Sequence, residues 1–79
     1  MSPTVFKGGG FRFYFFSREE SRIHIHVHGE KGEAKFWIEP QIELAQNYGL
    51  ADTELKLVRK LIEEHKHEIR NAWSRHFSG

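Results

Sequence analysis

The chain has 79 residues, a formal net charge of +1 with histidine neutral, and no cysteine. This length suits a single domain spanning residues 1–79, and the lack of cysteine excludes disulfides and thiolate metal sites. Because the net charge is small, nucleic-acid binding would require a local cationic patch. No apolar run approaches the roughly 20 residues of a membrane span and no signal pattern is present, so we expect a cytoplasmic protein that makes no membrane contact.

The first half of the chain alternates apolar and polar residues with a period of two, which indicates β-strands. Gly8, Gly9 and Gly10 interrupt this alternation as a turn, and glycines at both ends of residues 29–32 indicate a hairpin loop. The pattern predicts four strands, at residues 4–7, 11–16, 22–28 and 33–38.

The pattern changes at Pro40, a residue suited to the first turn of a helix. We predict a short helix over residues 40–48, ended by Gly49. A long amphipathic helix is predicted over residues 53–76, because apolar residues recur there at spacings of three and four. This order predicts an α+β fold, in which a four-stranded antiparallel β-meander over residues 4–38 carries both helices on one face.

The alternation also assigns side chains to the two faces of the sheet. The helices should cover the face that carries Ile23, Ile25 and Val27, since these are the apolar positions of the third strand. We expect a core formed by Phe13, Ile23, Ile25, Phe36, Leu55, Val58, Ile62 and Ile69. The opposite face, which no predicted element covers, should carry Arg12, Tyr14, Phe16, His24, His26, His28, Lys35 and Trp37.

His24, His26 and His28 share that face, because every second residue of a strand points the same way. Two such imidazoles could converge on a metal ion, with Glu30 or Glu33 as a further ligand. The spacing lacks a fixed distant ligand, however, and we expect no metal and no other cofactor. A histidine pair can also act as general acid and base on a phosphodiester, so the three histidines are the candidate catalytic residues of a metal-independent ribonuclease.

On the same face, the aromatic rings of Tyr14, Phe16 and Trp37 are interleaved with the cations Arg12, Arg22 and Lys35. Several small modules bind single-stranded RNA on such a surface, and non-catalytic RNA binding is therefore one alternative. Aromatic and arginine side chains also dominate protein interfaces, so a protein partner or a second copy of the chain fits equally well. We expect the main recognition surface to consist of Tyr14, His26 and Trp37, with Arg12 and Lys35 at its margin.

Several segments along the whole chain form a joint pattern: Pro3-Thr4-Val5, the glycine turn, residues 11–15, 24–28, 32–37 and 44–49, and the long helix ending near Trp73 and Phe77. Together these segments resemble one small bacterial family, the domain-of-unknown-function family numbered four-one-six-zero. Members of this family are usually standalone chains, and their genes often lie beside that of a second small domain in pairs proposed as toxin–antitoxin modules. The resemblance implies a bacterial protein that acts as the toxin component of such a pair. Its open sheet face or helix end would be masked by the cognate small protein from the adjacent gene.

Overall fold

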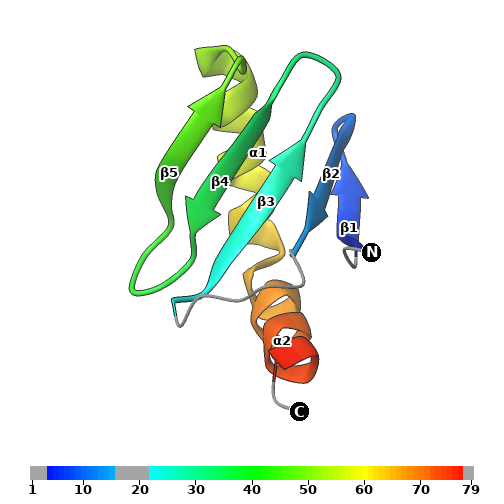
Figure 1. Ribbon diagram of the computed structural model, residues 1–79, viewed down its shortest axis with the longest axis vertical. Helices are drawn as coiled ribbons and strands as arrows, with labels where there is room; N and C mark the ends of the chain where they lie inside the picture. Colours follow the sequence, from blue (N-terminus) through cyan, green and yellow to red (C-terminus); the bar gives the residue numbers. More distant parts are fainter. Residues whose placement is uncertain (1–3, 16–21, 78–79) are drawn as a thin grey trace.

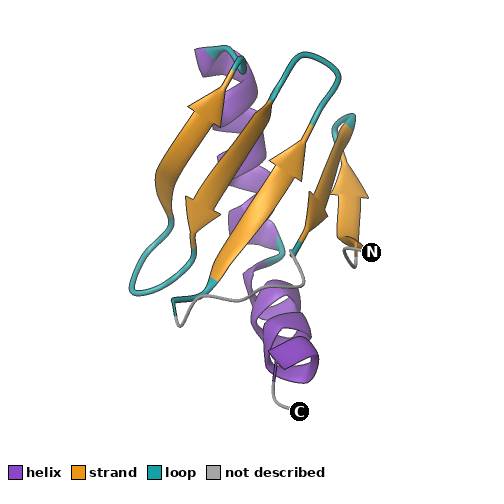
Figure 2. Cartoon of the chain, in the orientation of Figure 1, coloured by secondary structure: helices purple, strands orange, loops and turns teal. Residues whose placement is uncertain are grey.

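The computed structural model describes residues 4–15 and 22–77. Within these residues, five strands form one antiparallel sheet in chain order, and two helices follow (Figure 1). The elements are β1 (Thr4–Gly8), β2 (Phe11–Tyr14), β3 (His24–His28), β4 (Glu33–Trp37), β5 (Glu43–Tyr48), α1 (Asp52–Glu64) and α2 (Lys66–Phe77). Helix α1 lies along one face of the sheet, and α2 continues beyond one end of it (Figure 2). The predicted α+β class, antiparallel sheet and two helices are confirmed, but the number of strands was wrong.

The β1–β2 hairpin explains two of the three consecutive glycines. Gly9 and Gly10 have φ angles of 59° and 85°, the left-handed region that a two-residue hairpin turn of type I′ needs at both positions. Other residues reach this region only with strain. The tight turn brings Lys7 directly opposite Arg12, a pairing that matters for the site below.

The predicted helix over residues 40–48 is wrong, because residues 43–48 form the fifth strand. This strand pairs with β4 through residues such as Lys35 and Gln46, and Ala45 is the extra residue of a bulge in the register. A helix here would have left the backbone of β4 without hydrogen-bond partners along one edge. Pairing with that edge outweighs the local helical signal, which came mainly from Pro40.

The helix predicted over residues 53–76 is interrupted at His65, so that α1 ends at Glu64 and α2 begins at Lys66. The His65 ring stacks on Phe6, with centroids 3.9 Å apart and planes at 11°, and its Nδ1 lies 2.8 Å from the Leu61 carbonyl oxygen. A side chain that bonds a carbonyl of its own helix is a recognised cause of helix bending. The break redirects α2 past the end of the sheet instead of across its face.

The predicted core is confirmed at six of its eight positions. Phe13, Ile25, Val58, Ile62 and Ile69 are fully buried and Phe36 is 2% exposed, whereas Ile23 and Leu55 are half-buried and pack against the core from its border. Ile23 precedes β3 and Leu55 lies in the first turn of α1, which explains their peripheral position. Further members of the core are Phe11, Phe15, Val27, Ala34, Ile38, Ile42 and Leu50.

Candidate functional site

The sheet face away from α1 presents its side chains in rows. Paired residues of neighbouring antiparallel strands point to the same side, so the register aligns them across the sheet. We call this surface the open face. Its three rows are Lys7–Arg12–His28–Glu33–Tyr48, Thr4–Tyr14–His26–Lys35–Gln46 and His24–Trp37–Glu43. Every candidate side chain predicted for this face lies on it except Phe16, which is outside the described residues.

Tyr14 occupies the middle row, but only 7% of it is exposed, contrary to the prediction that it lies open. Its ring stacks on His26 with centroids 5.6 Å apart, and the Arg12 guanidinium carbon lies 4.5 Å from the ring centroid. Burial raises the pKa of the Tyr14 hydroxyl above its ordinary value, and the Glu33 carboxylate adds to this effect while the Arg12 guanidinium opposes it. The phenol therefore stays neutral at neutral pH and serves as part of the floor of the open face.

His24 is also not open, with 3% of its surface exposed. Its ring meets Trp37 and Trp73 edge-on, with centroid distances of 5.7 and 5.1 Å, and its Nδ1 lies 2.9 Å from the Arg22 carbonyl oxygen. Trp73 reaches this position from α2, and it also contacts Phe15 in the core. The residue that covers His24 thus comes from the helix end, which the period-two pattern of the strand did not predict.

Trp37 carries two cations over its ring. The Arg22 guanidinium carbon and the Lys35 ammonium lie 4.4 and 4.5 Å from the ring centroid, within the range of cation–π attraction. Arg22 also donates to the Glu39 carbonyl at 2.8 Å and to the Glu43 carboxylate at 3.2 Å. Positive charge at this end of the open face is therefore held in position by several contacts.

The remaining row contains a histidine–carboxylate pair. His28 Nδ1 lies 3.0 Å from Glu33 Oε2, and both side chains are more than half exposed. In the same row, Arg12 donates from Nε to the Thr4 hydroxyl at 2.7 Å. His28 is thus the histidine of the open face that a ligand can approach most easily, and the carboxylate fixes which ring nitrogen faces outward.

Sequence reasoning missed Lys7 and Trp73 as residues of this surface. Lys7 could have been found, because a two-residue glycine turn places it opposite Arg12. Trp73 could not, since its position depends on the helix break at His65. Arg22, by contrast, was predicted among the cations of this face, and its guanidinium lies over the Trp37 ring.

Across residues 4–15 and 22–77, no three His, Asp or Glu side chains are grouped so that they could hold a metal ion. In the same part of the chain, neither helix has the length and apolar character needed to cross a membrane. The described side chains of the open face are cations, imidazoles, the carboxylates of Glu33 and Glu43, and partly covered aromatic rings.

Comparison with known proteins gives one match. Residues 10–74 match a family described as a domain of unknown function, DUF4160. No curated protein and no solved structure matches the chain. The matched segment runs from the β1–β2 turn to Ser74 in α2 and so includes nearly all of the open face. The chain therefore belongs to the DUF4160 family.

Proposed function

We propose that this chain is a small bacterial cytoplasmic protein of a toxin–antitoxin-like pair, acting as the toxin component, and that its partner protein binds the open face. The observation that carries the proposal is the charge of that face. Within the described part of the chain, the cationic side chains of the open face outnumber its carboxylates. The cations are Lys7, Arg12, Arg22 and Lys35, and the carboxylates are Glu33 and Glu43. The pairing itself comes from the family resemblance, which implies a second small protein encoded beside this one.

The aromatic rings favour a protein partner over single-stranded RNA. Stacking of a base requires a bare ring face. Tyr14 is buried beneath its neighbours, and the Trp37 ring has cations at 4.4 and 4.5 Å from its centroid. Carboxylates of a protein partner can bind these cations where they stand, through charge-assisted hydrogen bonds. We therefore expect the surface of the partner that meets the open face to be acidic.

One contact favours a second candidate function, a metal-independent ribonuclease. The 3.0 Å contact between His28 and Glu33 is the arrangement that orients a general base. His24 is unsuited to this role because it is buried, and His26 is half-buried against Tyr14. If the chain has such an activity, we propose that His28 carries it.

The first test expresses the chain with and without the neighbouring gene and measures growth and complex formation. We expect slower growth from the chain alone and normal growth with its neighbour. Lys35→Glu should weaken the complex roughly tenfold or more, because it places a carboxylate against an acidic partner. The matched control is Lys60→Glu, an exposed position on α1, which should bind as the parent does.

Two results would contradict the proposal separately. A folded Lys35→Glu variant that binds the neighbouring protein with unchanged affinity excludes the open face as the interface. Normal growth when the chain is expressed alone excludes the toxin assignment. Binding of RNA in place of the protein, with Lys35→Glu weakening it, would identify the face as an RNA-binding surface.

A further inference from the structure

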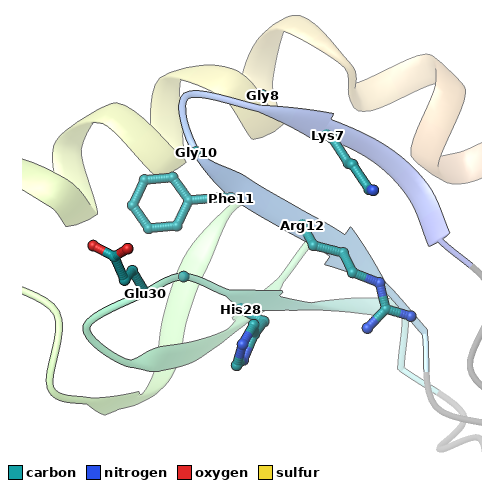
Figure 3. Close-up of a pocket in the computed structure, with 8 residues that line it drawn as sticks. Lys7, Gly8, Gly10, Phe11, Arg12, His28 and Glu30 are labelled. Carbon is teal, nitrogen blue, oxygen red and sulfur yellow. The ribbon is translucent and has the colours of Figure 1, made fainter.

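A depression of about 540 Å³ lies between the β1–β2 turn and the β3–β4 loop, at one end of the open face (Figure 3). Its volume is within the range of small-molecule sites, about 300–1,000 Å³. Lys7, Arg12 and His28 line it together with Phe11 and Glu30. Figure 3 shows Lys7 and Arg12 at one end, and Glu30 beside Phe11 at the other. The depression thus has a cationic end and an end that carries a carboxylate.

The register makes the cationic end compact. Lys7 pairs with Arg12 across the hairpin, and Arg12 pairs with His28 on the next strand. Side chains of directly paired residues begin about 5 Å apart, so an ammonium, a guanidinium and an imidazole can all reach one small anion. Three different strands supply these groups, and their spacing is set by backbone hydrogen bonds.

Two of the three groups are also oriented. The Arg12 side chain is held by the Thr4 hydroxyl at 2.7 Å and by the Tyr14 ring at 4.5 Å. The Glu33 carboxylate lies 3.0 Å from Nδ1 of His28, which leaves the opposite ring nitrogen, Nε2, to a ligand in the depression. Fixing donors before the ligand arrives lowers the entropy cost of binding.

From this geometry we infer that the depression binds the phosphate group of a phosphate monoester. Phosphate supplies several oxygens and up to two negative charges, which match lysine, arginine and protonated histidine donors. Glu30, at the other end of the depression, repels negative charge. The part of the ligand that lies next to Glu30 is therefore uncharged or cationic. Such a group occurs both on a free nucleotide and at the end of an RNA chain. The inference does not depend on the proposed protein pair.

The test is a nuclear magnetic resonance titration of the isotope-labelled full chain. The probes are inorganic phosphate, adenosine monophosphate, adenosine, and a short oligoribonucleotide with and without a 5′-phosphate. We expect saturable shifts centred on Lys7, Arg12 and His28 with every phosphate-ended probe and no such shifts with adenosine. Lys7→Ala and His28→Gln should each weaken binding roughly fivefold or more, as expected for an exposed charge-assisted contact. Lys60→Ala, which removes one exposed cation from α1, should leave binding unchanged.

The relative affinities distinguish the two sources of the phosphate. Tighter binding of adenosine monophosphate than of the phosphorylated oligonucleotide assigns a small-molecule ligand, and the reverse order assigns an RNA end. Equal binding of adenosine and adenosine monophosphate would overturn the inference. Shifts spread evenly over all cationic side chains, or an equal effect of Lys7→Ala and Lys60→Ala, would overturn it too. Because no second protein is present, failure here leaves the proposed pairing unaffected.

Discussion

His24, His26 and His28 stand two residues apart on one strand and point to the same side of the sheet, yet their surroundings differ. His24 is buried between tryptophans, His26 is half-buried against Tyr14, and His28 is exposed beside Glu33. Alternation along a strand determines the face of the sheet to which each side chain points. How deeply that side chain is buried depends on the neighbouring strands and helices. Ligand access therefore concentrates at His28, at the hairpin end of β3.

Tyr14 allows a test of burial at the residue scale. Its pKa is raised above the ordinary value of 10.0, chiefly because burial disfavours the phenolate. The neutral form is thus favoured in the folded state, and the stability from this group is present below about pH 10 and is lost as the pH rises through the folded pKa. We expect the ultraviolet absorbance of tyrosinate to show a component at high pH that Tyr14→Phe removes and Tyr48→Phe retains. Identical curves for the two variants would contradict the burial of Tyr14.

At the scale of elements, β5 and the break at His65 decide what the open face looks like. Strand β5 extends the face to Gln46 and Tyr48, which a helix at this position would not have supplied. The break between α1 and α2 brings Trp73 to the end of the sheet, where it touches both His24 and Phe15. The break depends on Phe6, a residue distant in sequence from His65, whereas β5 pairs with the strand that precedes it in the chain.

Helix α2 should therefore protect His24. We expect Trp73→Ala to increase the reaction of His24 with diethyl pyrocarbonate several-fold, because the ring that covers it is gone. Trp73 is half-buried, so the same variant should lose roughly 2–3 kcal/mol of stability, less than a fully buried tryptophan would. The measurement is peptide mass spectrometry at a temperature where circular dichroism shows a folded chain. Leu57→Ala, at an exposed position of α1, is the control. Unchanged reactivity of His24 in Trp73→Ala would show that α2 does not cover it.

At the scale of the whole molecule, one sheet face carries the core and the other carries the polar and aromatic rows. Helix α1 supplies Val58 and Ile62 to the core, and α2 supplies Ile69, all fully buried. This division places the core and the proposed recognition surface on opposite sides of the same five strands. Substitutions on the open face can therefore change binding without removing core contacts.

The division also predicts how the fold responds to metal removal. The core is closed by aromatic and aliphatic side chains from both helices and the sheet, so folding should not require an ion at the histidine row. We expect a chelator to leave the melting temperature of the chain unchanged to within about 2 °C, which corresponds to less than roughly 0.5 kcal/mol for a domain of this size. A larger drop that zinc reverses would show that histidines hold a structural metal.

The α+β class, the burial of the Ile25 face and the family could be predicted from the sequence, because each depends on patterns within short segments. A period of two identifies strands and their faces wherever it occurs, and apolar residues three and four apart identify helical segments. The local glycine turn likewise determines the pairing of Lys7 with Arg12.

The tertiary structure alone decided the fifth strand, the helix break, and the burial of Tyr14 and His24. Residues 43–48 carried a weak helical signal and became a strand because the edge of β4 offered backbone partners. The ring of His65 stacks on Phe6 from β1, a residue far away in the chain, and the redirected α2 then covers His24 with Trp73. Patterns within short segments do not show which distant segment packs against them. The depression beside His28 could therefore be recognised only in the tertiary structure, where the two hairpins lie side by side.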